Sequence, residues 1–491
     1  MSRLGLFLQP VFAIRSGFLS ARVMQPQVPS CHHAEHPHNK NLSPWCGEEE
    51  GTPRGFRFED EPKRQISLAS HDLQMVLKYR GIPSLKEPGS IYPLLSLTEY
   101  HPCISSRSDS NTKIKMPLQA HGLSSTIIHS IIKLLIHNLV NITDTTGEFL
   151  LRLPDGRVID TKGWNDWEWT HGIGLYGLYQ YHTLTADTST LTIINDWFTK
   201  RLAEGTTKNI NTMAVFLTLA YLYEDTGNRT YLPWLESWAE WAMHDLPRTP
   251  FGGMQHETYA AANTDELWDD TLMMTVLPLA KIGKVLNRPA YVEEAKKQFL
   301  LHLQYLFDTS TGLFFHGWKF DSSAEGGVGH NFARARWARG NSWLTIAIPD
   351  FIELLDPVEN DPIRAHLIDA LVAQCRALKR YQADSGMWCT LLNIPESEGS
   401  YEEASATAGF AYGILKAVRK RYIGYEYQEV AINAIKAVLE KVSGEGELLH
   451  VSFGTAMGHN LQHYKDIALT SMPYGQAMAI MALGEFLRSF V

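Results

Sequence analysis

The sequence has few of the features that mark several large protein classes. It has five cysteines in 491 residues and no CxxC pair, so it predicts neither a disulfide framework nor a zinc site. No apolar run approaches the roughly 20 residues that a membrane-spanning helix needs. The formal net charge is -9 and there is no long basic run, which argues against a nucleic-acid partner. No motif calls for a metal or an organic cofactor, and we expect none.

The N-terminal quarter differs from the rest of the chain. Residues 1–115 carry polar clusters and little hydrophobic periodicity, so we expect an irregular, partly disordered extension at 1–115 and a helical domain at 116–491. Arg3 is followed by LGLFLQPVFAI, which has the size of a signal-peptide core, but no convincing cleavage site follows it. We therefore expect a cytoplasmic protein and leave secretion open.

From residue 124 onward, apolar residues recur at the helical period in about twelve segments of two alternating kinds. The charged, amphipathic segments are Ser124–Leu139 (the least charged), Leu191–Glu204, Tyr231–Asp245, Ala290–Phe307, Pro362–Tyr381 and Tyr427–Val442. The nearly charge-free segments are Gly172–Tyr181, Met213–Tyr223, Leu272–Ile282, Trp343–Ile348, Thr407–Val418 and Gln476–Leu487. Charge-free helices should be enclosed and amphipathic ones should face water. The alternation predicts an all-α fold, an (α/α)6 toroid of six hairpins; a solenoid would show a fixed-length repeat, and we find none.

The loops indicate where a site should lie. Most loops that lead into charge-free segments are long and rich in aromatic residues, histidine and glycine, whereas loops that leave them are short. In an alternating ring the loops that lead into the inner, charge-free helices (the inward loops) share one face. The N-termini of the inner helices add partial positive charge at that face. We therefore expect the site on that face and a preference for an anionic ligand.

The segment Thr264–Ile282, TDELWDDTLMMTVLPLAKI, combines acids with a buried helix. Its capping-type residues Thr264–Glu266 predict that the helix begins there. Asp269 and Asp270 follow Trp268 and precede an almost charge-free run. Buried acids are costly unless something satisfies or uses them, so the pair either caps the helix or carries chemistry. Helical periodicity does not distinguish the two acids.

The inward loops and helix starts also supply aromatic and basic side chains. They are Trp169, His171, His256, His316, Trp337, Arg339, Trp343, Trp388 and His459. Aromatic faces stack on sugar rings, arginine pairs with carboxylates, and histidine and aspartate transfer protons. Each residue has a structural alternative: a tryptophan can be core, a histidine can bond a neighbouring loop, and Arg339 can hold a structural carboxylate. Their coincidence at one predicted face favours a site.

Several motifs between residues 120 and 491 carry a family resemblance. They are ELWDDTLMM, HGW, WARGNSW, SGMW, YEEASATAGFAY and GTAMG…PYGQAMAIMAL. In order and spacing they resemble glycoside hydrolase family 105, the unsaturated rhamnogalacturonyl hydrolases, which are related to family 88. The resemblance implies a six-hairpin α/α toroid, in agreement with the helix pattern.

The resemblance also implies an unusual hydrolysis. The family's substrates carry a C4=C5 double bond left by a polysaccharide lyase. An aspartic acid protonates C4, water adds at C5, and the hemiketal collapses with release of the neighbouring sugar, unlike the ordinary two-carboxylate route. The donor must start protonated, and we expect an enclosed apolar setting to raise its pKa. The expected partner is an anionic unsaturated oligosaccharide from lyase-degraded pectin.

Motif positions assign roles within the resemblance. The catalytic aspartate falls on Asp270, and the substrate-contacting histidine and arginine fall on His316 and Arg339. Trp343 and Trp337 become stacking or wall residues. Trp169, His256, His171, Trp388 and His459 complete the expected substrate-binding set, together with Asn211.

Two positions depart from the related patterns. Asn211 stands where family 88 relatives carry a second aspartate, and because an amide cannot serve as an acid, this favours family 105. Lys319 follows HGW where an acid is often found, and it could add attraction for a uronate.

Other interpretations stay open. A catalytically silent toroid that binds acidic oligosaccharides would not depend on Asp270. An unsaturated glucuronyl hydrolase like those of family 88 is another alternative. An ordinary glycosidase for saturated sugars would need a second carboxylate, such as Glu168 or Glu257.

Overall fold

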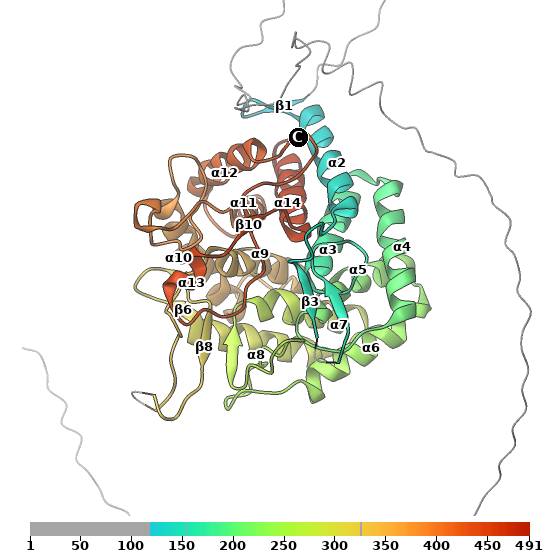
Figure 1. Ribbon diagram of the computed structural model, residues 1–491, viewed down its shortest axis with the longest axis vertical. Coiled ribbons are helices and arrows are strands. Elements are labelled where there is room, and N and C mark those ends of the chain that lie inside the picture. Colours follow the sequence, from blue (N-terminus) through green and yellow to red (C-terminus); the bar gives the residue numbers. More distant parts are fainter. Residues whose placement is uncertain (1–117, 154, 325–326) are drawn as a thin grey trace, which may run out of the picture. The chain divides into compact units, whose positions relative to one another are not determined.

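The computed structural model describes residues 118–153, 155–324 and 327–491, so the extension expected at 1–115 lies outside the described residues. The helices of the described part form two concentric rings (Figure 1). The inner helices are α3 (Trp169–Thr185), α5 (Phe216–Thr226), α7 (Leu277–Val285), α9 (Ala338–Leu355), α11 (Ala404–Arg419) and α14 (Pro473–Phe490). The outer helices are α2 (Ser125–Asn141), α4 (Thr188–Glu204), α6 (Leu232–Glu240), α8 (Pro289–Leu306), α10 (Pro362–Tyr381) and α12 (Gln428–Glu440).

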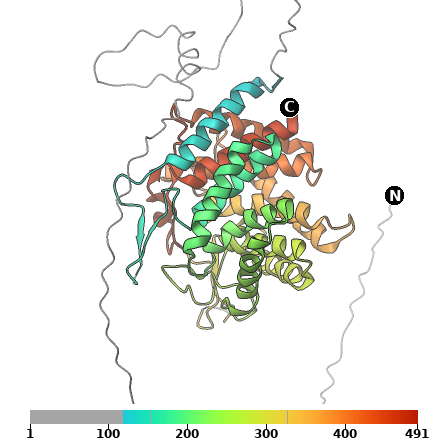
Figure 2. The ribbon, with the colours of Figure 1, turned by 90° about the vertical axis from the view of Figure 1, so that its right-hand side faces the viewer.

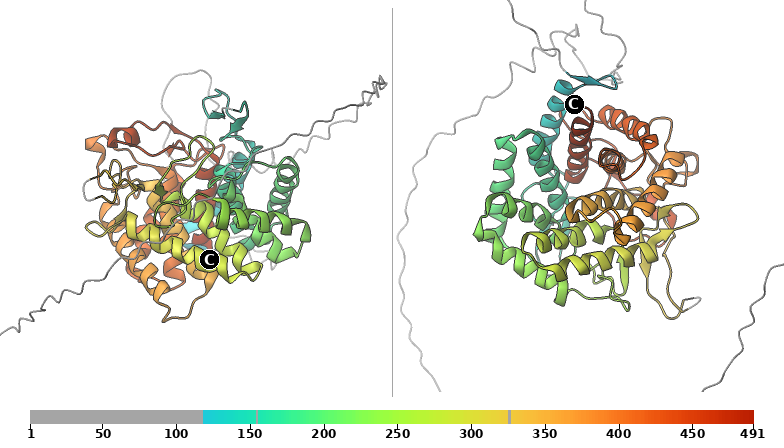
Figure 3. Two further views of the ribbon diagram at one scale, coloured as in Figure 1. Left: turned by 90° about the horizontal axis from the view of Figure 1, so that it is seen from below. Right: turned by 180° about the vertical axis from the view of Figure 1, so that it is seen from behind.

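The inner ring is closed. Each inner helix packs on the next one in the chain, and α14 packs on α3 as well as on α11. The view from behind shows the same arrangement of outer helices around inner ones (Figure 3), and the view from the side shows α2 and α4 along one side of the described part (Figure 2). The predicted (α/α)6 toroid is therefore confirmed.

Burial follows the charge pattern from which the two rings were predicted. In α11 every residue from Ala404 to Val418 is buried, because neighbours surround this charge-poor helix on all sides. In α10 the buried positions Leu367, Ala370, Leu371 and Gln374 recur at helical spacing, so one face packs inward and the other meets water.

Short elements connect the two rings. The helical turns are η1 (Thr212–Val215), η2 (Arg229–Tyr231), η3 (Trp241–Asp245), η4 (Leu272–Val276), η5 (Glu396–Glu398), η6 (Tyr425–Tyr427) and α13 (Leu461–Lys465). The strands are β1 (Gln119–Ala120), β2 (Leu123–Ser124), β3 (Leu150–Arg152), β4 (Val158–Asp160), β5 (Glu266–Trp268), β6 (Phe307–Asp308), β7 (Leu313–Phe314), β8 (Gly317–Lys319), β9 (Val451–Ser452) and β10 (Leu469–Thr470). None of the helices in the described residues is both long and apolar enough to cross a bilayer.

The prediction that the central helix begins at Thr264 is wrong. Thr264 and Asp265 form a turn, and β5 then pairs antiparallel with β8, with Leu267 opposite Trp318. The helix starts at Asp270 and runs through the π-helical turn η4 into α7. Strand pairing with a distant segment thus outweighs the local capping pattern, and it fixes the backbone on which the two acids stand.

Candidate active site

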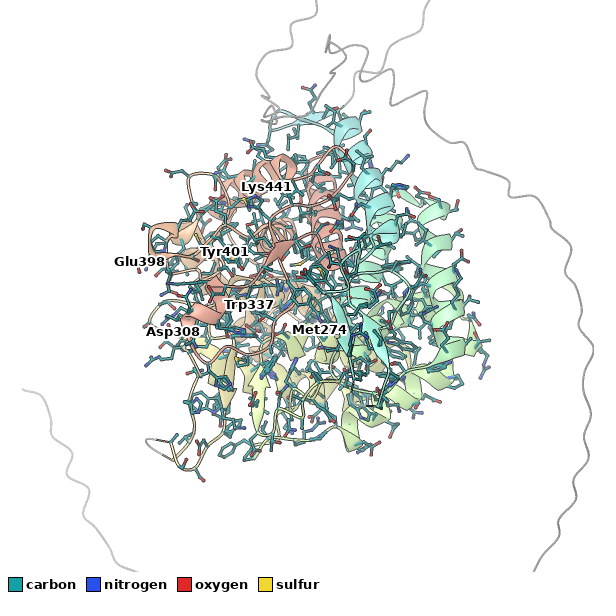
Figure 4. The ribbon with its side chains drawn as sticks, in the orientation of Figure 1. Met274, Asp308, Trp337, Glu398, Tyr401 and Lys441 are labelled. Atoms are coloured by element: carbon teal, nitrogen blue, oxygen red, sulfur yellow. The ribbon has the colours of Figure 1, made fainter. Side chains whose placement is uncertain are left out.

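A cavity of ≈ 390 Å³ opens on the face where the inner helices begin. Segments that lead into four of these helices, and the first turn of α9, line it, with Glu168, Asn211, Asp270, Arg339 and Phe453 as examples. Figure 4 shows Trp337, another lining residue, toward the middle of the ring, whereas Glu398 lies at its rim. The structure therefore places a cavity on the predicted face.

Asp270 lies at this cavity in the first turn of its helix, and its side chain is 17% exposed. Its Oδ1 accepts a hydrogen bond from Trp343 Nε1 at 3.1 Å, and its Oδ2 lies 3.3 Å from His316 Nε2. Trp343 comes from α9 and His316 precedes β8, so three separate segments meet at one carboxylate.

His316 is positioned by further contacts. Its Nδ1 lies 2.7 Å from the hydroxyl of Tyr464, and that hydroxyl accepts a hydrogen bond from the backbone N–H of Gly458 at 3.1 Å. The tyrosine proton has two acceptors in reach, His316 Nδ1 and the weaker Met457 Sδ at 3.6 Å. When it points at Nδ1, Nε2 carries the proton that Asp270 accepts. Burial lowers the pKa of His316, in agreement with this neutral tautomer.

Arg339 is a buried cation, 1% exposed, that also lines the cavity. It donates to the carbonyl oxygens of Ser452 (2.7 Å) and Phe453 (2.9 Å) and to the Ser452 hydroxyl (2.5 Å). It forms no ion pair with an acid among the described residues, so it does not hold a structural carboxylate. The guanidinium thus brings an unneutralised positive charge to the cavity wall.

The two adjacent acids have opposite electrostatic environments. For Asp270, burial acts to raise the pKa, but the hydrogen bond from His316 leads the opposing interactions that bring it below its ordinary value. For Asp269, burial and then the charge of Asp270 raise the pKa well above its ordinary value. The expectation of a raised pKa at Asp270 is therefore wrong: the raised pKa belongs to its neighbour.

Glu168 is a second acid at the cavity. It is 3% exposed, its Oε1 accepts from Asn211 Nδ2 at 3.0 Å, and its Oε2 accepts from the backbone N–H of Trp169 at 2.6 Å. Burial raises its pKa to about 8 despite these hydrogen bonds. Glu168 is therefore neutral at neutral pH, and the predicted cavity residue Asn211 orients it.

Aromatic rings form much of the remaining wall. Trp169 lines the cavity, lies edge-on to Trp343 at 6.0 Å, and packs against Tyr474. His256 stacks on Trp268 with ring centroids 4.2 Å apart, and burial lowers its pKa to about 3. Neutral rings of this kind suit contact with a sugar face.

Five predicted residues do not line this cavity: His316 and Trp343 reach it only through their contacts with Asp270, and three others lie elsewhere. His171 is buried at the start of α3, where it bonds the Glu168 N–H and the Gly163 carbonyl, so it fixes the helix start. Trp388 is fully buried and donates to the Leu378 carbonyl. His459 is exposed and packs on Phe332.

Lys319 also faces elsewhere. Its Nζ donates to the Thr264 carbonyl and pairs with Glu266 at 3.5 Å, so it is not the extra cation suggested for a uronate.

Other wall residues were not singled out from the sequence. Phe149, Tyr259, Phe453 and Thr455 line the cavity, and Tyr464 supports His316. No motif marks the first four, and only tertiary structure brings them here. Tyr464 ends the histidine-rich run GHNLQHY, and that run is the local pattern that could have drawn attention to it.

One cluster of metal-ligand type occurs in the described residues. Asp269, Asp270 and His316 each bring one atom to within 4.8 Å of the others. Because His316 and Trp343 already bond Asp270, the geometry fits an acid–base cluster at least as well as a cation site.

Comparisons with known proteins agree with the fold. The family model described as Glycosyl Hydrolase Family 88 matches residues 141–490. The unsaturated rhamnogalacturonyl hydrolase YesR of Bacillus subtilis is 30% identical over 327 residues, which cover 66% of this chain and 90% of that protein.

Two crystal structures are more similar still. They are described as possible members of the GH105 family, from Salmonella enterica serovar Paratyphi A and Klebsiella pneumoniae. They are 60% and 59% identical, with TM-scores of 0.74 and 0.73, and each alignment covers 78% of this chain and 100% of the other. This chain is therefore a glycoside hydrolase that matches the family 88 model and belongs to the related family 105.

Proposed function

We propose that the enzyme hydrolyses unsaturated uronyl oligosaccharides of the kind that a lyase releases from rhamnogalacturonan, with Asp270 as the proton donor. The observation that carries this proposal is the placement of Asp270 and the unneutralised Arg339 on one cavity, with His316 3.3 Å from Asp270. The name of the Bacillus subtilis relative, an unsaturated rhamnogalacturonyl hydrolase, supports the substrate class.

The proposed step begins with the substrate carboxylate near Arg339, which supplies charge-assisted hydrogen bonds. Asp270 then protonates C4 of the double bond, and positive charge develops at C5 and the ring oxygen. Water adds to C5 while Asp270, now anionic, takes up its proton. The C5–ring-oxygen bond opens to a ketone, and the hemiacetal left at C1 releases the neighbouring sugar.

The surrounding residues have complementary roles in this proposal. His316 and Trp343 hold the two oxygens of Asp270 in place through their ring N–H groups. Trp169, Trp337 and His256 form aromatic walls for the sugar ring. Glu168 and Asn211 offer polar contacts to sugar hydroxyls, and because Glu168 is neutral it does not repel the anionic substrate.

The test follows the ultraviolet band of the conjugated unsaturated uronate during incubation with an unsaturated rhamnogalacturonan disaccharide. Wild type should abolish the band as the double bond is hydrated, and Asp270→Asn should preserve it while remaining folded. Wild-type-like turnover by Asp270→Asn would rule out the assignment. Cleavage of a saturated uronide, with the band of the unsaturated one unchanged, would instead favour a two-carboxylate glycosidase that uses Glu168.

A further inference from the structure

Asp269 is a fully buried acid that the proposed reaction does not use. It is 0% exposed, and its backbone N–H donates to the His316 carbonyl at 3.0 Å. Neither of its carboxyl oxygens makes a hydrogen bond of normal geometry within the described residues. The carboxyl group packs on the bare backbone of Gly340, where a Cβ would lie 2.2 Å from Oδ2. α9 therefore leaves space for this side chain but gives it no donor.

An ionised carboxylate in such a place is strongly disfavoured. Transfer of an unpaired charge into a low-dielectric interior costs many kcal/mol, and taking up a proton removes most of that cost. Asp270 has the opposite situation, because ring N–H groups of Trp343 and His316 bond its two oxygens. A single proton shared by the two acids therefore resides on Asp269 when no substrate is bound.

We infer that Asp269 is the proton store of the active site, which supplies through Asp270 the proton that the substrate receives. This inference rests on the proposed function. One oxygen of each acid lies within 4.8 Å of the other, a gap that a small side-chain rotation or one water spans. Asp269 is a positioning residue in this account, because only Asp270 touches the substrate.

The proton balance closes over one turnover. The proton leaves the Asp269 carboxyl for Asp270 and then forms the new C4–H bond with the electron pair of the double bond. The water that adds to C5 gives one proton to Asp270, which restores one shared proton to the pair. No oxidant, reductant or other co-reactant is needed.

The surroundings favour storage of a proton over a bound cation. The titratable and charged groups near the pair are His256, His316, Arg339 and Tyr464. Both histidines have lowered pKa values, so Arg339 is the permanent positive charge among them. A divalent ion between the two acids would keep both anionic and would remove the proton donor that the proposed reaction requires.

The test compares Asp269→Asn, whose amide matches the neutral acid in size, with wild type over pH 5–9. Without the store, Asp270 must take its proton from solvent, so the alkaline limb of kcat should move to lower pH. Each unit of that movement lowers kcat at pH 7 by about tenfold, with KM little changed and activity recovered toward pH 5. Asp265→Asn, a matched change in the turn before β5, should leave the profile unchanged.

Several results would overturn the inference. They are a wild-type pH profile in a folded Asp269→Asn, an equal loss at every pH, or activity that a chelator abolishes and Mn²⁺ restores. If wild type itself leaves the ultraviolet band intact, the proposed function fails first.

A second readout does not depend on activity. The folded protein should keep the proton on Asp269 at a pH where the unfolded chain releases it, so wild type should lose stability relative to the variant as pH rises. The difference in Tm between the two proteins should therefore change between pH 5 and pH 8 in favour of the variant, and a constant difference would contradict the inference. Asp269→Ala provides the same comparison if the amide does not fold.

Discussion

Replacement of Glu168 by glutamine gives a quantitative test of the electrostatics at the cavity. Burial raises the pKa of Glu168 from an ordinary 4.5 to about 8. Between these values the native protein holds the proton and the unfolded chain does not, so wild-type stability should fall as pH rises through that window. At 1.36 kcal/mol per pKa unit, the contribution is on the order of 5 kcal/mol, an upper bound for a group that can relax.

The assay is guanidinium unfolding followed by tryptophan fluorescence at intervals from pH 4.5 to 8.5. Glutamine keeps the shape of the neutral acid, and a rotated Asn211 amide can accept a hydrogen bond from its N–H. The free energy of unfolding of the variant should therefore be close to that of wild type at pH 4.5 and several kcal/mol higher at pH 8. Glu148→Gln, an exposed acid at the same cavity, serves as the control. A stability difference between Glu168→Gln and wild type that stays constant with pH would refute a buried, protonated Glu168.

Two further predictions concern the groups around Asp270. Arg339→Lys should raise KM for the unsaturated substrate by roughly tenfold or more, because hydrogen bonds to charged groups contribute about 1.5–3 kcal/mol. The control in the steady-state assays is His459→Ala, which lies outside the cavity. An unchanged KM in the lysine variant would exclude carboxylate binding by Arg339. Trp343→Phe removes the N–H that reaches Asp270 at 3.1 Å, and it should lower kcat about tenfold while KM stays within about threefold. Single-turnover kinetics that match wild type would show that this hydrogen bond does not contribute to the chemical step.

The architecture could be predicted from the sequence because the pattern that encodes each helix lies within that helix. Charge-free and amphipathic segments alternate at the helical period, and α10 spans the predicted Pro362–Tyr381 without correction. The start of the central helix was wrong because the pairing of Leu267 with Trp318 depends on a segment about 50 residues away. Capping patterns do not detect such non-local contacts.

The sequence predicted which residue types form the site but not where their side chains point. Two loops that carry cavity residues also carry His171 and His459, whose side chains turn to the helix start and the solvent, and Trp388, on a loop without cavity residues, turns to the core. Helical periodicity left Asp269 and Asp270 equivalent, yet Asp270 faces the cavity and Asp269 faces Gly340. Their pKa shifts depend on donors from distant segments, which no local pattern contains.

The most direct test of proton transfer from Asp270 is product analysis after turnover in D2O. Protonation of the double bond predicts one solvent deuterium at C4 of the released keto-uronic acid, seen by NMR immediately after reaction, with none incorporated by Asp270→Asn. A product that keeps its C4=C5 double bond and carries no deuterium at C4 would contradict the account, because the glycosidic bond would then have been cleaved directly.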